Sequence, residues 1–123
     1  MLKRILVVED DPGYQDLIET ILRPAYDVTL VASAEVAIDK LDKERFDLVI
    51  TDINLLGMTG FEVLAKIKNA GLEQVIPVIM CSGHSEPLTR ERAMKYGAAG
   101  FVTKPYPPGN IISLVRVLLG EKA

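Results

Sequence analysis

Short apolar runs alternate along the chain with longer segments whose apolar residues recur every three or four positions. The runs lie at residues 5–8, 26–31, 48–51, 78–81 and 100–103. A short apolar run bounded by polar or turn residues is typical of a buried strand, and the longer spacing is typical of a helix that packs one face on a sheet. The alternation predicts βαβ units, and therefore one doubly wound parallel sheet of five strands with helices on both faces.

Capping residues predict where the helices begin and end. Asp11 is the expected N-cap before Pro12, and Ser33 and Ser85 are the expected N-caps of the second and fourth helices. Gly71 is the expected residue just beyond the third helix. The fourth helix has few apolar residues, so we expect it to be the most weakly anchored. Those residues are Leu88, Ala93 and Met94.

The composition is that of an ordinary globular domain. With 123 residues, 49% of them hydrophobic and 25% charged, we expect residues 1–123 to form a single domain with a real core. The net charge of −3 and the scattered basic residues predict no nucleic-acid binding. No apolar run reaches membrane-spanning length and no signal peptide is evident, so we expect no membrane association. Cys81 is the single cysteine, which favours a buried hydrophobic role in a cytoplasmic protein.

Polar residues follow four of the five predicted strands. Glu9 and Asp10 end the first strand, Asp52 the third and Ser82 the fourth, and Lys104 follows the fifth. Each alone has a structural explanation as a cap, a turn residue or a surface charge. The carboxyl ends of parallel strands meet at one edge of the sheet, where open α/β sheets bind their ligands. Their convergence therefore predicts one shared site.

The residue types of this predicted site favour phosphate chemistry with a divalent cation. Clustered carboxylates repel one another unless a cation joins them, and oxygen ligands without His or Cys suit Mg²⁺ or Mn²⁺. A lysine and a hydroxyl supply further contacts to a phosphate. A carboxylate can itself be the nucleophile and form an aspartyl phosphate, and Asp52 is the most central of the acids.

Four stretches carry a resemblance that covers the whole chain. They are VVEDD at 7–11, DLVITD at 47–52, MCSG at 80–83 and GFVTKP at 100–105. Together they resemble the motifs of response regulator receiver domains, the chemotaxis-type receivers of two-component signalling. The resemblance, rather than the periodicity, implies a flavodoxin-like fold with strand order 2-1-3-4-5.

The resemblance also implies the composition of the phosphorylation site. Asp52 matches the phosphoacceptor, and Asp10 matches the direct ligand of Mg²⁺ or Mn²⁺. Glu9 matches the second acid, which often reaches the metal through water. The backbone carbonyl of Asn54 matches a third protein ligand. A sensor histidine kinase or a phosphotransfer protein is the implied phosphoryl donor, and the implied catalysis is limited to the domain's own phosphorylation and dephosphorylation.

Further positions match the parts of the family that bind the phosphoryl group and transmit its presence. Lys104 matches the phosphate-binding lysine before a cis bond to Pro105. Ser82 and Phe101 match the switch hydroxyl and the switch aromatic residue. The implied output face comprises the fourth helix, fifth strand and fifth helix, where a downstream protein or a second copy binds. His84 either modulates the approach of water to the phosphoryl group or is a solvent-facing loop residue.

Two positions depart from the family pattern. Leu56 stands where proline is usual, and Thr59 stands where aspartate commonly precedes the loop glycine. Because of these two departures, the resemblance does not predict how stiff this loop is. Leu55 and Leu56 are adjacent apolar residues in an expected surface loop, where they could mark a contact surface.

Two other classes of protein remain as alternatives. An Asp-nucleophile phosphatase or phosphotransferase similar to the haloacid dehalogenases is expected to have an Asp-x-Asp pair and a cap domain, but Asn54 is the second residue after Asp52 and the chain has no room for a cap. A flavodoxin-like flavin carrier is expected to have a Ser/Thr/Gly-rich loop after the first strand. Residues 9–11 are all acidic and would repel the flavin phosphate.

Overall fold

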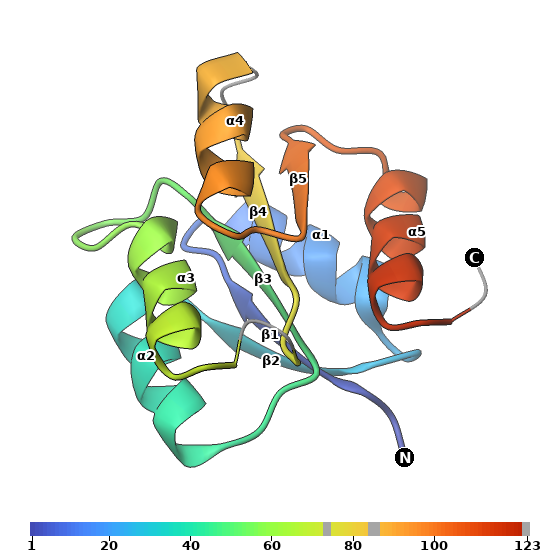
Figure 1. The fold of residues 1–123 in the computed structure, drawn as a ribbon. Coiled ribbons are helices and arrows are strands. Elements are labelled where there is room, and N and C mark those ends of the chain that lie inside the picture. The colour runs from blue at the N-terminus through green and yellow to red at the C-terminus, as the bar shows by residue number, and fades with distance from the viewer. Residues whose placement is uncertain (73–74, 84–86, 122–123) are drawn as a thin grey trace.

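A computed structural model describes residues 1–72, 75–83 and 87–121 of the chain, and its centre is a five-stranded parallel sheet. The strands lie in the order β2-β1-β3-β4-β5 (Figure 1), as the resemblance implied. Their bounds are β1 Arg4–Val8, β2 Asp27–Val31, β3 Leu48–Asp52, β4 Val78–Ser82 and β5 Gly100–Thr103.

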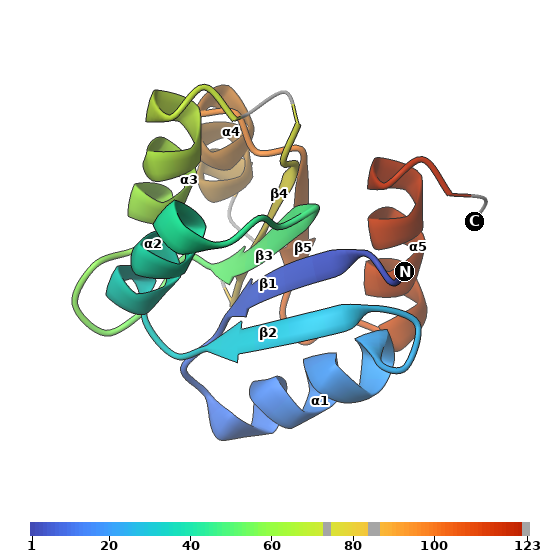
Figure 2. The same cartoon turned by 90° about the horizontal axis from the view of Figure 1, so that it is seen from below.

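Five helices connect and flank the strands, and they divide between the two faces of the sheet. Helices α1 and α5 cover one face, and α2, α3 and α4 cover the other (Figures 1 and 2). Their bounds are α1 Pro12–Leu22, α2 Ala34–Lys43, α3 Gly60–Asn69, α4 Pro87–Lys95 and α5 Pro108–Leu118. Within the described residues, none of these helices has both the length and the apolar character that crossing a membrane requires.

The core consists of two layers because successive residues of a strand point to opposite faces of the sheet. In β1, Leu6 and Val8 pack beneath α2, α3 and α4, whereas Ile5 and Val7 pack beneath α1 and α5. The central strands are buried on both faces, so they appear in the sequence as continuous apolar runs. Cys81 is buried in the second layer, as expected, and burial raises the pKa of its thiol.

Most of the predicted helix boundaries are confirmed. The Asp11 side chain accepts a hydrogen bond of 3.0 Å from the Tyr14 N–H, and the Ser33 hydroxyl accepts one of 3.2 Å from the Val36 N–H. Gly71 lies just beyond α3 with a φ of +73°, a left-handed conformation that glycine adopts readily. The predicted cap Ser85 lies outside the described residues.

Thr59 has a capping role that the sequence interpretation did not assign. Its hydroxyl accepts a hydrogen bond from the Phe61 N–H, while the Glu62 carboxylate accepts one from the Thr59 N–H. This reciprocal capping box fixes the start of α3. Threonine, which stands here in place of the common aspartate, therefore still provides a helix-capping side chain.

Helix α4 is weakly anchored, as predicted. Ala93 is the one buried side chain among those of α4 that the structure describes. Two arginines hold the helix against aromatic rings instead: the Arg90 guanidinium lies 5.1 Å from the ring centre of Phe101, and that of Arg92 lies 4.5 Å from the ring centre of Phe61. Cation–π contacts of this kind are weaker than a buried apolar stripe.

Two apolar residues of α5 outside its fully buried positions differ in exposure. Val117 is 60% exposed. Ile112 is half-buried and packs on the core of the α1 and α5 face. Val117 is therefore the more accessible of the two to a partner.

Candidate functional site

The site residues lie where the strand ladders end at one edge of the sheet. Asp52, the last residue of β3, is in register with Cys81 of β4. The Glu9 N–H donates to the Val31 carbonyl at 3.0 Å, and the Lys104 N–H donates to the Ser82 carbonyl at 2.8 Å. These bonds continue the ladders past the strands and fix the backbone of the site residues.

Three carboxylates converge at this edge. One oxygen from each of Glu9, Asp10 and Asp52 lies within 4.8 Å of the others. Glu9 is buried and Asp52 is only 7% exposed, so solvent screens their repulsion poorly. An all-oxygen donor set of this geometry fits a hard divalent cation such as Mg²⁺ or Mn²⁺.

Lys104 supplies the positive charge inside this cluster. Its Nζ lies 2.5 Å from Glu9 Oε1 and 3.1 Å from Asp52 Oδ2, and its side chain is only 10% exposed. The peptide bond between Lys104 and Pro105 is cis, as the resemblance implied, and so is that between Arg23 and Pro24. One ammonium group thus joins two acids that lie far apart in the sequence.

The charges gathered in this cluster shift the pKa values of Asp52 and Lys104. Burial raises the pKa of Asp52; the Lys104 ammonium partly offsets this shift, while Glu9 and Asp10 add to it. For Lys104, burial acts to lower the pKa, but the hydrogen bonds and charges of Glu9 and Asp52 outweigh burial and raise it. Without a metal, Asp52 therefore carries its negative charge at a cost, and a cation placed beside it reduces that cost.

The loop between β3 and α3 contacts Asp10 through a backbone hydrogen bond. The Leu56 N–H donates a hydrogen bond of 3.2 Å to Asp10 Oδ2. A proline at position 56 has no N–H and could not make this bond. The departure from the family pattern therefore changes which groups contact the acid, while the Leu56 side chain itself is exposed.

Two residues of α1 complete the site and were missed by the sequence interpretation. The Tyr14 ring lies beneath the Lys104 ammonium, with 4.2 Å between Nζ and the ring centre, and packs 5.8 Å from the Tyr106 ring. The Gln15 side-chain amide donates to the Glu9 carbonyl at 2.7 Å. The position of Tyr14 in the first turn of α1, just after the acids at residues 9–11, was the available signal in the sequence.

The remaining predicted residues lie around this cluster in different environments. Ser82 ends β4 and is buried, and Phe101 of β5 is buried beneath Arg90. Asn54 is exposed two residues after Asp52, and the role of its carbonyl as a metal ligand stays a prediction. His84 lies outside the described residues.

Known proteins share both the sequence pattern and this fold. Residues 5–116 match the response regulator receiver domain family. The chain belongs to this family. The resemblance drawn from the four motifs is thereby confirmed, and the receiver has a signalling role in two-component systems.

Similar proteins are found among full-length response regulators. The receiver is 41% identical to the two-component response regulator ORR26 of Oryza sativa subsp. japonica over 105 residues, which cover 83% of this chain and 18% of that protein. It is 33% identical to the response regulator protein FleR of Pseudomonas aeruginosa over 123 residues, which cover 98% of this chain and 26% of that protein. The chain therefore spans about a fifth to a quarter of the length of these relatives.

Solved receiver structures superpose closely on this one. The receiver domain of the sensor histidine kinase PA1611 of Pseudomonas aeruginosa has a magnesium ion coordinated in its active site cleft, and it is 27% identical with a TM-score of 0.87 over 98% of this chain and all of that one. The BeF3-activated receiver domain of DrrB is 26% identical with a TM-score of 0.89 over the same shares of the two chains.

Proposed function

We propose that Asp52 accepts a phosphoryl group from a sensor histidine kinase or a phosphotransfer protein, and that residues 1–123 act as one receiver unit in doing so. The observation that carries the proposal is the position of the Asp52 carboxylate, buried between two acids and 3.1 Å from the Lys104 ammonium. This is a nucleophile held beside a phosphate-binding cation. The domain's own catalysis is limited to forming and hydrolysing its aspartyl phosphate.

The metal in this proposal is Mg²⁺, or Mn²⁺ in its place. Glu9, Asp10 and Asp52 hold it, with the backbone carbonyl of Asn54 as a further ligand. The bound ion supplies charge neutralisation, which lets an anionic phosphoryl group approach three carboxylates. The neighbour PA1611, which binds magnesium in its cleft, supports this assignment.

The residues of this chain divide the transfer step between them. An Asp52 carboxylate oxygen forms the new O–P bond, while the P–N bond of the donor phosphohistidine breaks and its nitrogen keeps the electron pair. Lys104 moves its ammonium contact from the Asp52 carboxylate to the phosphoryl oxygens. Ser82 donates a hydrogen bond from its hydroxyl group to another phosphoryl oxygen. If His84 faces the site, it adjusts the approach of water and hence the lifetime of the phosphoryl group.

Incubation with acetyl phosphate and MgCl₂, followed by intact-mass measurement, tests this function. The wild-type protein is expected to gain one phosphoryl group, and chelation of the metal is expected to prevent the gain. Asp52→Asn is expected to gain none, since an amide oxygen is a poor nucleophile. Asp47→Asn, at the other end of β3, is the matched control and should be phosphorylated like the wild type. Phosphate incorporation in Asp52→Asn, or without divalent cation, would exclude the proposal.

The output of the switch runs from Ser82 and Phe101 to the face formed by α4, β5 and α5. Phe101 lies between the core and Arg90 of α4, so a change at Phe101 reaches the most weakly anchored helix directly. A downstream protein or a second copy binds this face in the proposal. We also infer a cytoplasmic location, the reducing compartment expected from a single buried cysteine.

Ser82→Ala is expected to separate phosphorylation from the conformational response. Beryllofluoride, a stable mimic of the aspartyl phosphate, should still bind to the variant, because Asp52, the metal ligands and Lys104 remain. Amide NMR shifts in α4 and β5 should be clearly smaller than in the wild type. Thr103→Val removes a neighbouring hydroxyl from β5 and should keep the full response. Equal shifts in Ser82→Ala and the wild type would show that Ser82 does not transmit the signal.

A further inference from the structure

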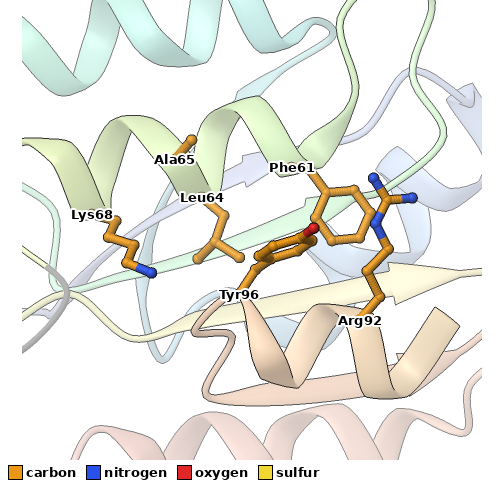
Figure 3. Close-up of a pocket in the computed structure, with 6 residues that line it drawn as sticks. All are labelled: Phe61, Leu64, Ala65, Lys68, Arg92 and Tyr96. Atoms are coloured by element: carbon orange, nitrogen blue, oxygen red, sulfur yellow. The ribbon is translucent and has the colours of Figure 1, made fainter. Parts of the chain in front are cut away.

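A groove with a volume of about 260 Å³ lies between α3 and α4, apart from the acidic cluster (Figure 3). Helix α3 supplies one wall, and Arg92 of α4 together with Tyr96 just after α4 supplies the other. The residues that line it are Phe61, Leu64, Ala65, Lys68, Arg92 and Tyr96. The proposed output face includes α4, but this groove lies on the side of α4 that faces α3.

The centre of the groove is apolar and aromatic. Leu64 is 2% exposed and forms part of the core beneath the groove, while Tyr96, in the turn just after α4, is 46% exposed. The Phe61 and Tyr96 rings meet edge to face, 5.7 Å apart and inclined by 81°. An apolar side chain placed against both rings would gain contact with α3 and with the turn after α4 at once.

Two cations flank this apolar centre. Figure 3 shows Lys68 and Arg92 toward opposite ends of the groove, with Leu64 and Tyr96 between them. Because Phe61, on which Arg92 packs, and Lys68 are seven residues apart on α3, the groove is roughly 10 Å long at 1.5 Å per residue. Within the described part of the chain, Lys68 and Arg92 form no salt bridge, whereas the nearby Lys66 pairs with Asp42.

Arg92 is already oriented to bind an anion. Its guanidinium packs 4.5 Å from the Phe61 ring centre and 5.7 Å from that of Tyr96. Stacking uses the faces of the guanidinium, and carboxylates bind to its N–H edge, so the two contacts are compatible. The aromatic rings therefore hold the arginine at the rim of the groove.

We propose that this groove binds an acidic segment of a partner protein. The segment inserts one large apolar side chain into the groove and carries a carboxylate on each side of that residue. The volume is below that of a typical pocket for a drug-sized ligand and suits one large side chain. The positive charges of Lys68 and Arg92 favour these carboxylates, because one carboxylate faces Lys68 and the other faces Arg92. In a helical segment, acids four residues before and after the apolar residue would span about 12 Å on one face, close to the length of the groove.

Peptide titration of the ¹⁵N-labelled receiver tests this proposal. The probes are acetylated and amidated alanine-based helical peptides in which one Trp is flanked by Glu four residues on each side, and the same peptides with Gln in place of Glu. The receiver contains no tryptophan, so peptide fluorescence gives the affinity while amide shifts locate the site. We expect shifts centred on residues 61–68 and 92–96, and about tenfold tighter binding of the acidic peptides.

Charge-removing variants distinguish this groove from general attraction to the basic residues. Lys68→Gln and Arg92→Gln are each expected to weaken binding of the acidic peptides about threefold and to leave the Gln peptides unaffected. Lys95→Gln, on the same helix outside the groove lining, is the control and should change nothing. If Arg92→Gln disturbs the packing of α4, Lys68→Gln still tests the proposal, because Lys68 lies on α3.

Several outcomes would overturn the proposal. They are absence of shifts at millimolar peptide, shifts centred on another surface, equal binding of the Glu and Gln peptides, and an effect of Lys95→Gln as large as that of Lys68→Gln. Concentration-dependent shifts of the groove residues without any peptide would identify a second copy of the chain as the occupant instead.

Discussion

Replacing Lys104 by methionine is expected to lower the free energy of unfolding of the metal-free receiver by about 3–5 kcal/mol. Methionine keeps an unbranched apolar side chain but removes the ammonium that contacts both Glu9 and Asp52. Three clustered carboxylates would then lack their nearest positive charge in a poorly solvated site. Urea unfolding in the presence of a chelator measures the loss.

An exposed lysine provides the matched control for this prediction. Lys43 forms a 3.0 Å salt bridge with Asp39 on the surface of α2, with both side chains more than half exposed. Lys43→Met is therefore expected to change stability by no more than about 0.5 kcal/mol. Added MgCl₂ should stabilise Lys104→Met more than the wild type, because a cation bound by the acids restores positive charge to the cluster. Equal stability of Lys104→Met and Lys43→Met under chelation would contradict the charge balance described above.

The loss caused by Lys104→Met is also expected to depend on pH. The pKa of Lys104 is raised in the folded state, so its stabilising contribution is fully present below the unfolded value of about 10.4 and is lost only as the pH rises through the folded pKa. The pKa of Asp52 is raised as well, so acidification protonates this group early. As the pH falls through the raised pKa of Asp52, the ammonium loses one of its two charged partners, so the difference between variant and wild type should shrink on acidification.

Gly60→Ala is the second substitution expected to have a large effect. A Cβ atom at this position would lie 2.2 Å from the Asp52 carbonyl oxygen and 3.1 Å from the Cα of Ile53. Both are backbone atoms that no side-chain rotation can move away. Either α3 or the end of β3 must shift, at a cost of about 2–3 kcal/mol.

The same shift would displace the phosphoacceptor. The carbonyl that the new methyl group contacts belongs to Asp52 itself, so we expect phosphorylation by acetyl phosphate to slow by about ten- to a hundredfold. Gly109→Ala in α5 is the control, since a Cβ there meets nothing within 4 Å and alanine favours a helix. Urea unfolding and intact-mass kinetics measure both effects; wild-type stability and rate in Gly60→Ala would show that the close approach is easily relieved.

The sequence by itself predicted the architecture and the edge of the sheet where the site lies. Periodicity and capping depend on neighbouring residues, so the apolar runs and residues such as Asp11 and Ser33 predicted strands and helices close to those observed. Parallel strands then required Glu9, Asp10 and Asp52 to meet at one edge. The strand order came from the family resemblance, because periodicity carries no information about which strands are neighbours.

Only the tertiary structure decided which atoms meet within that site and around it. Lys104 reaches Glu9, 95 residues away, the Tyr14 ring lies beneath the same ammonium, and Gly60 approaches the Asp52 backbone. The groove between α3 and α4 likewise depends on how two helices settle on one face of the sheet. Such contacts join residues that are remote in sequence, and their geometry follows from side-chain packing across the core rather than from the local preferences that a sequence pattern records.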